Sequence, residues 1–308
     1  MKPQVAVVLG YYDGLEYIQE QLNSIREQVG VDVQIYIFDD WSPIPLQLDQ
    51  LKLASADLDR IKITRRSRNL NFSDNFLLGL AECPNHFDYY AFSDQDDIWD
   101  RDKLLTAVAA ISHSDDQCPA LYCSRTRIVA DCGIRELGFS PLFEKKPSFA
   151  GALVQNIGGG NTMVMNASAR ELVVAASFDT AVVSHDWWAY LVVSGVGGKV
   201  IYDPEAHVSY RQHGKNAVGA NSSFKARFQR FLMLFSGRFK RWNSLHCIAL
   251  RRNKEYLTEY NSELLESFCD ARQKGGLSAI RVFDRLRIER QTLFGQIGLK
   301  IGLLFRKI

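Results

Sequence analysis

Long apolar runs, paired cysteines and internal repeats are all missing from this sequence of 308 residues. Nowhere do 18 apolar residues follow one another, so we expect no helix that spans a bilayer. The six cysteines form no Cys-x-x-Cys pair and no Cys/His metal spacing, which favours reduced, structural thiols in a cytosolic protein. The opening MKPQVAVVLG holds only a short apolar run, and we expect a first strand there and no signal peptide. With 46% hydrophobic and 23% charged residues, the composition is that of a globular protein.

Acidic residues are scarce in the last part of the chain. Residues 221–308 hold 18 Lys and Arg against 7 Asp and Glu, whereas residues 1–220 hold 19 against 28. We therefore predict two regions, a domain over 1–220 and a basic helical region over 221–308. The basic excess favours an anionic partner, such as a lipid surface, a nucleic acid or an acidic protein.

The first hundred residues alternate between short apolar runs and amphipathic segments. Runs of strand length at 4–10, 32–38, 60–64 and 88–93 are separated by helical patterns at 15–28, 46–55 and 72–83. This alternation predicts an α/β fold with a single, mostly parallel sheet flanked by helices. Further on, we expect strands at 120–129 and 199–204, the latter stopped by proline, and helices at 168–177 and 184–195, with Ser184 as the N-cap of the second.

Polar clusters follow three of the predicted strands. They read YYDG after the first strand, DDWS after the second and SDQDD after the fourth, and the carboxyl ends of parallel strands are where ligands bind. In the third cluster, Asp94, Asp96 and Asp97 stand within four residues, so their charges repel one another. A divalent metal such as Mg²⁺ or Mn²⁺, shared with phosphate oxygens, would neutralise them. The alternative is a solvated acidic loop.

Five segments in order resemble the family-2 inverting glycosyltransferases. FSDQDDIWDRDKL is similar to the family's metal-binding segment, and YYDG, FDDWS, HDWW and YRQHGKN to four further motifs, so that the resemblance covers about residues 4–220. It is closest to the branch with bacterial rhamnosyltransferases of cell-surface polysaccharide synthesis. It implies the nucleotide-diphospho-sugar transferase fold of the GT-A type, with a C-terminal basic helical extension in this chain.

The resemblance implies a donor site. Asp94 and Asp96 match the acids that hold the metal and touch the donor sugar, while Asp97 either caps the next turn or bonds a ligand water. Tyr12 and Asp40 match the aromatic and acidic residues that contact the nucleotide base. The glycine-rich segment nominates Gly160 and Asn161 beside the donor sugar. The closing loop supplies a metal ligand or diphosphate contact from His213 and phosphate-balancing charge from Arg211 and Lys215; alternatively these are structural or solvated residues.

Asp186 matches the catalytic base of the family. A carboxylate within hydrogen-bond reach takes the proton of the acceptor hydroxyl as it attacks the anomeric carbon. The alternative is that Asp186 only occupies the first turn of a helix, where negative charge is favourable. His185 beside it either orients Asp186 or packs, and we expect a supporting role.

The implied activity is metal-assisted transfer of a sugar, with inversion, from a nucleotide-diphospho-sugar. We expect L-rhamnose from dTDP-rhamnose, delivered to a hydroxyl of a cell-surface polysaccharide such as O-antigen or of a lipid-linked saccharide. The nearest alternative is the same chemistry with a UDP-hexose or UDP-N-acetylhexosamine donor. Remoter alternatives are a sugar nucleotidyltransferase and a non-catalytic binding module.

The start of the basic region predicts a membrane-surface helix. Its apolar residues lie on one helical face, with Lys and Arg around them, as in helices that lie in an anionic membrane surface; they are Phe224, Phe228, Phe231, Leu232 and Phe235. We therefore expect a cytoplasmic protein, peripheral at the inner face of the bacterial cell membrane. The alternative is a helix that packs back on the first domain. Nucleic acid is not expected as a partner because no binding motif accompanies the charge.

Overall fold

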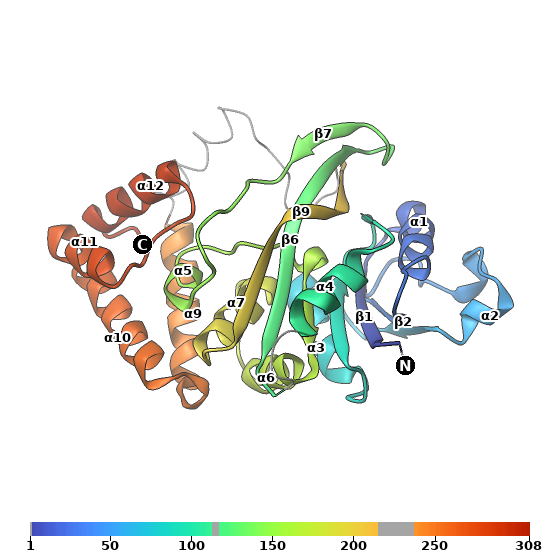
Figure 1. Cartoon of the computed structure of the whole chain (residues 1–308), viewed down its shortest axis with the longest axis horizontal. Coiled ribbons are helices and arrows are strands. Elements are labelled where there is room, and N and C mark those ends of the chain that lie inside the picture. Colours follow the sequence, from blue (N-terminus) through green and yellow to red (C-terminus); the bar gives the residue numbers. More distant parts are fainter. Residues whose placement is uncertain (1, 113–116, 215–236) are drawn as a thin grey trace.

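The computed structural model describes residues 2–112, 117–214 and 237–308. In this part of the chain a nine-stranded sheet has the order β3-β2-β1-β4-β8-β6-β9-β5, with β7 paired to β6 (Figure 1). Its first four strands are mutually parallel, as predicted; they are β1 (Gln4–Tyr11), β2 (Asp32–Asp39), β3 (Ile61–Arg65) and β4 (Tyr89–Ser93).

The second half of the sheet is mixed. Strand β8 runs antiparallel to both β4 and β6, β6 and β9 are parallel, and β5 and β7 pair antiparallel with their neighbours. The strands are β5 (Ile98–Trp99), β6 (Ala120–Ala130), β7 (Glu136–Phe139), β8 (Val164–Asn166) and β9 (Lys199–Gln212).

Two predicted elements differ from the structure. Strand β9 does not stop at Pro204 but continues to Gln212, because the register with β6 shifts between Ser124 and Arg125, where an irregular ladder tolerates a residue without an N–H. The helix expected over 46–55 is replaced by a 3-10 turn, η1 (Leu48–Gln50), and a short helix, α2 (Ser55–Leu58).

Helices cover both faces of the sheet. Alternate side chains of β1 enter two separate apolar cores: Val5, Val7 and Leu9 pack with one set of helices, and Ala6 and Val8 with the other. The first set is α1 (Leu15–Arg26) and α4 (Lys103–Ser112). The second includes α3 (Phe72–Glu82), α5 (Phe149–Ala152), α6 (Ala167–Ser177) and α7 (His185–Gly195). Burial on both faces explains why the strand reads as a continuous apolar run.

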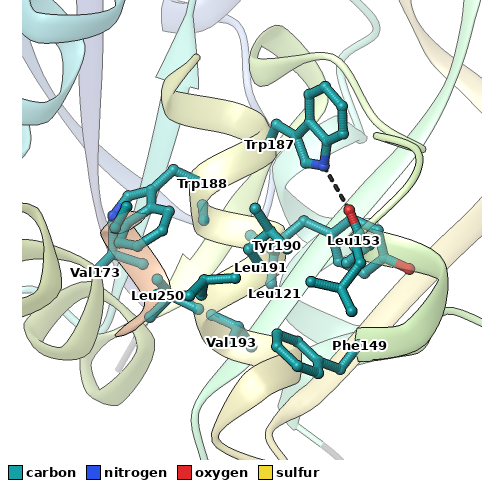
Figure 2. Close-up of a cluster of buried hydrophobic side chains, with 14 of the residues drawn as sticks. Leu121, Phe149, Leu153, Val173, Trp187, Trp188, Tyr190, Leu191, Val193 and Leu250 are labelled. Carbon is teal, nitrogen blue, oxygen red and sulfur yellow. Dashed lines mark hydrogen bonds between the residues drawn. The ribbon is translucent and has the colours of Figure 1, made fainter. Parts of the chain in front are cut away.

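The C-terminal helices extend the second core at one end of the molecule (Figure 1). They are α9 (Arg238–Arg252), α10 (Glu259–Lys274), α11 (Gly276–Arg285) and α12 (Leu293–Leu304), with a 3-10 turn η3 (Lys254–Tyr256) after α9. Figure 2 shows the junction, where Leu250 of α9 lies among side chains of α7 such as Trp188 and Leu191. No helix of the described chain is long and apolar enough to cross a membrane. The predicted boundary at 220 and the apolar residues 224–235 lie outside the described residues.

Candidate active site

The loops that follow β1, β2 and β4 are tied to one another at the carboxyl edge of the sheet. The side chain of Gln95 accepts a hydrogen bond from the Tyr12 backbone N–H (2.8 Å) and donates one to the Tyr12 carbonyl (3.0 Å). The Asp13 N–H donates to Ser42 Oγ (3.1 Å). Gly14 permits this approach, since a Cβ there would lie 2.2 Å from the Gln95 amide. The three polar clusters predicted at the strand ends therefore do lie together.

Two buried aspartates stand at the end of β2, beside an exposed tyrosine of the loop after β1. Asp39 is buried and accepts hydrogen bonds from the N–H groups of Ser42 and Leu46, so it shapes the turn. Asp40 Oδ1 accepts from the Leu70 N–H (2.7 Å), and burial raises the pKa of Asp40. Tyr12, in the neighbouring loop, is 49% exposed, as expected of a residue that packs against a ligand.

Four carboxylates from two distant segments meet at the end of β4. The pKa of Asp94 is raised well above its usual value by burial and then by repulsion from Asp97, Asp96 and Asp186. Asp186 lies in the first turn of α7, almost a hundred residues along the chain from Asp94. The structure thus brings the predicted metal ligands and the predicted base together, although the sequence gives no spacing rule that joins them.

The side chain of Asp97 is buried and hydrogen-bonded to another part of the protein. It is 1% exposed, its Oδ2 accepts a hydrogen bond from Asn161 Nδ2 (2.6 Å), and its Oδ1 has no partner among the described residues. Burial and the nearby Asp96 raise the pKa of Asp97 to about 7. The buried Lys103 lies near it, with its Nζ 3.2 Å from the centroid of the Trp99 ring, and burial lowers the pKa of Lys103. Asp97 therefore anchors the glycine-rich segment to the acidic loop.

The end of β9 and the residue that follows it place Arg211 and His213 against the acidic loop. His213 Nε2 lies 2.7 Å from Asp96 Oδ2, and its ring stacks on Tyr17 with centroids 4.6 Å apart. Arg211 is buried; it donates from Nε to the Asp96 carbonyl (3.0 Å), and its other nitrogens contact Glu20 and the Asp131 carbonyl. Arg211 thus supports the loop through protein contacts. Lys215 lies outside the described residues.

The start of α7 is packed under the glycine-rich segment. Ser184 is the N-cap residue, as predicted, but its side chain makes no capping hydrogen bond. The His185 ring stacks on Phe76 at 4.2 Å and meets Phe92 edge-on at 4.8 Å. A Cβ at Gly160 would lie 2.2 Å from His185 Nε2, so only glycine fits against the ring. Burial lowers the pKa of His185 to about 4, so the ring is neutral beside Asp186.

The donor set suits a hard divalent cation. Carboxylate oxygens and one imidazole are ligands for Mg²⁺ or Mn²⁺; among the described residues Asp97 Oδ1 has no hydrogen-bond partner, and burial and repulsion between the carboxylates raise the pKa of Asp94. Within the described residues, however, no three His, Cys, Asp or Glu side chains are arranged to hold a metal. A cation bound here would take one or two carboxylates and complete its shell with substrate phosphates and water.

Two residues of the candidate site, Gln95 and Trp41, were not predicted from the sequence. Gln95 stands inside the acidic motif, but its bridge to Tyr12 links residues 83 positions apart. Trp41, next to Asp40, is 47% exposed with a left-handed backbone (φ 66°), and the Arg65 guanidinium lies 4.4 Å from its ring centroid. The tryptophan directly after Asp40 in DDWS was the available signal in the sequence. In the structure its indole is exposed, and a bulky residue rarely adopts a left-handed backbone.

Comparisons with known proteins match this architecture. The chain is 28% identical over 232 residues to the "dTDP-rhamnosyl transferase RfbG" of Shigella flexneri, covering 71% of this chain and 76% of that protein. Among solved structures it is similar to S. aureus TarS 1-349 in complex with UDP-GlcNAc, with a TM-score of 0.52 at 12% identity over 100% of this chain and 90% of the other. It is also similar to the mannosyltransferase PcManGT from Pyrobaculum calidifontis in complex with GDP-Man and Mn²⁺, with a TM-score of 0.50 at 16% identity over 100% and 86%.

These likenesses confirm the predicted fold class, an α/β sheet flanked by helices of the GT-A type with a helical C-terminal region. The model of the family described as "Glycosyl transferase family 2" matches residues 6–167. This match includes β1 to β4, the acidic loop and the glycine-rich segment. Because it covers more than half of the 308 residues, the chain belongs to glycosyl transferase family 2.

Proposed function

We propose that this family-2 glycosyltransferase moves L-rhamnose from dTDP-rhamnose, with inversion, to a hydroxyl of a cell-surface polysaccharide or lipid-linked saccharide. The observation that carries the proposal is the meeting of Asp94, Asp96, Asp97 and Asp186 at the carboxyl end of β4. The choice of rhamnose rests on the similarity to the Shigella dTDP-rhamnosyl transferase. The N-terminal 220 residues would form the catalytic domain and 221–308 a basic helical region.

In this proposal the donor occupies the three joined loops. Tyr12 packs against the base and Asp40 accepts a hydrogen bond from it, while Gly160 and Asn161 border the sugar. Asp94 and Asp96 would hold Mg²⁺ or Mn²⁺, which when bound stabilises the leaving diphosphate as a Lewis acid, and His213 beside Asp96 would supply the further metal or diphosphate contact. Arg211, whose guanidinium is engaged by protein acceptors, adds positive charge beside the acidic loop, and Lys215 is proposed to balance phosphate charge.

Asp186 then acts as the general base. Its carboxylate takes the proton of the acceptor hydroxyl, whose oxygen bonds to the anomeric carbon while the bond to the diphosphate breaks. The neutral, closely packed His185 fixes the start of α7 without adding charge beside Asp186. A single displacement of this kind requires no covalent enzyme intermediate.

Substitution of Asp186 by Asn tests the base. We expect Asp186→Asn to lower kcat by about 10²–10⁴-fold, because a general base contributes that much, with donor affinity almost unchanged. Glu259→Gln is the matched control, since Glu259 also occupies the first turn of a helix, in α10. Transfer by Asp186→Asn at a rate near the parent's would show that Asp186 is not the base.

A panel of nucleotide sugars tests the donor and the cation. Hydrolysis of dTDP-rhamnose, UDP-galactose and UDP-N-acetylglucosamine, each with Mg²⁺, Mn²⁺ or EDTA, needs no knowledge of the acceptor. We expect dTDP-rhamnose to be cleaved fastest, and EDTA to suppress the reaction. Preference for a UDP-sugar would replace rhamnose with the alternative donor class, and full activity in EDTA would remove the cation from the proposal.

We also propose that the enzyme works at the inner face of the bacterial cell membrane, held there peripherally through its basic C-terminal region. The support is the charge of residues 221–308, with 18 Lys and Arg against 7 Asp and Glu, and the chemistry of lipid-linked acceptors.

A further inference from the structure

Helix α12 has one buried apolar face and one apolar face that is partly exposed to solvent. The buried face consists of Gly298, Leu299, Gly302 and Leu303, which pack into the C-terminal core. The other face is exposed at the two ends of the helix, at Leu293 (75%), Phe294 (75%) and Ile297 (47%) near its start and at Leu304 (42%) and Phe305 (62%) at its end, with the half-buried Ile301 between them. At 3.6 residues per turn, the five exposed positions form a stripe within about a third of the helix circumference. Exposed apolar side chains that gather on one face of a helix mark an interaction surface, unlike scattered single apolar residues.

A neighbouring surface of α11 continues the stripe. Leu277 is 67% exposed, and Arg281 and Arg285 follow it at i+4 and i+8 on the same exposed face. The ion pair between Lys300 Nζ of α12 and Asp284 of α11 (2.9 Å) joins the two helices beside this face. Figure 1 shows α11 and α12 at the opposite end of the molecule from α2.

The charge around the stripe is strongly positive. Residues 276–308 contain seven Lys and Arg against two Asp and Glu, and one of those two acids is the Asp284 paired with Lys300. Arg306 and Lys307 follow the stripe directly at its C-terminal end. A second copy of this chain would bring two such positive surfaces together, which like-charge repulsion disfavours. An anionic surface is complementary to it.

We propose that the exposed stripe of α12, with the basic face of α11, is the surface that inserts at the headgroup level of an anionic lipid bilayer. Twelve helical residues extend only about 18 Å, less than the roughly 30 Å of a bilayer core, so the helix lies in the interface and does not span. Phenylalanine and leucine on one side and arginine and lysine at the margin are the composition of interfacial helices. This location differs from the segment at 224–235 expected from the sequence. The inference rests on the proposed peripheral contact and assigns that contact to particular residues.

Flotation with vesicles tests the surface on the full chain. We expect the protein to float with vesicles that contain phosphatidylglycerol and to remain behind with pure phosphatidylcholine or in high salt. The double substitution Leu293→Ser with Phe294→Ser should lower the bound fraction at equal lipid by about tenfold or more, since it removes the most exposed apolar area. Arg306→Glu with Lys307→Glu should weaken binding only to the anionic vesicles.

Phe178→Ser is the matched control, because Phe178 is 86% exposed but lies at the end of α6. It should float like the parent. Circular dichroism and donor hydrolysis in vesicle-free buffer report folding and the proposed chemistry separately, so loss of flotation with hydrolysis retained concerns the membrane surface alone. The proposal is overturned if the parent does not float with anionic vesicles, or if the α12 variant floats as well as the parent. Loss of flotation from Phe224→Ser with Phe228→Ser but not from the α12 variant would also overturn it, as would a dimer in light scattering that the α12 variant abolishes without any lipid binding.

Discussion

Two buried histidines should each lower the free energy of unfolding on acidification, opposite in sign to the buried Asp97, whose raised pKa makes the folded protein take up a proton before the unfolded chain does. His185 is 5% exposed and His246, in α9, is 1% exposed, and neither ring has a hydrogen-bond partner for either nitrogen among the described residues. Burial lowers the pKa of His185 to about 4, with Asp186 opposing the shift. Burial, reinforced by Arg272, lowers the pKa of His246 to about 3. Both rings are therefore neutral in the folded protein, while in the unfolded chain they take up protons near their ordinary value of 6.5.

The size of the effect follows from that difference. As pH falls below 6.5 the unfolded chain gains protons that the folded protein does not, so the free energy of unfolding decreases until the folded pKa is reached. At about pH 5, which lies above both folded pKa values, each histidine costs about 2 kcal/mol relative to pH 7.5. The two together cost about 4 kcal/mol, a large share of the roughly 5–15 kcal/mol that stabilises a typical domain.

Urea unfolding at about pH 7.5 and pH 5, followed by tryptophan fluorescence, measures the net change in stability, and the difference between a histidine variant and the parent isolates the histidine loss. His246→Met removes one of the two rings while keeping an adaptable apolar side chain in contact with Trp187, whose ring lies 4.6 Å from that of His246. It should recover about 2 kcal/mol of the acid-dependent loss. The control is His86→Gln, because His86 is exposed and should leave the loss unchanged. If His246→Met loses as much stability on acidification as the parent, the buried ring is not the source.

Two further predictions concern the packing of the active site. Gly160→Ala should lower the free energy of unfolding by about 1–3 kcal/mol and reduce transfer, because the new Cβ would lie 2.2 Å from His185 Nε2. Gly214→Ala, where a Cβ meets nothing within 4 Å, is the control, and equal denaturation midpoints for the two variants would contradict the clash. Gln95→Ala should raise the KM for the donor several-fold with a smaller change in kcat, because it removes two hydrogen bonds of about 1 kcal/mol each that hold the Tyr12 backbone. Steady-state kinetics check this, and an unchanged KM would show that the bridge does not order the donor loop.

Much of the fold could be predicted because local patterns reflect burial. The run at 4–10 is apolar at every position since β1 feeds two cores, and this is visible without knowledge of its neighbours. The end of β9 was not predictable in the same way. Pro204 is a reliable strand terminator only if the ladder is regular, and the register shift that tolerates it depends on β6, some eighty residues earlier.

The candidate site was predictable in position but not in its internal contacts. The strand-end rule places Asp40 and Asp94 near each other because it depends only on strand direction. The partners of Arg211 and Asn161 could not be foreseen, since they lie 115 and 64 residues away in the chain. Both residues were expected to face the donor, and in the structure each also donates to the acidic loop. Whether a polar residue near a site faces a ligand depends on which protein acceptors lie within its reach.

This distinction separates the three aspartates that look equivalent in SDQDD. Asp97 is buried and accepts from Asn161, and Asp96 lies 2.7 Å from the His213 imidazole. No described residue donates a hydrogen bond to the carboxylate of Asp94, and its pKa is raised by burial and by three neighbouring carboxylates. A half-buried carboxylate without a hydrogen-bond partner is costly, and such groups are kept where a ligand supplies the missing charge. Asp94 is therefore the member of the cluster whose neutralisation most depends on a group from outside the chain, which supports its assignment to the donor and its cation.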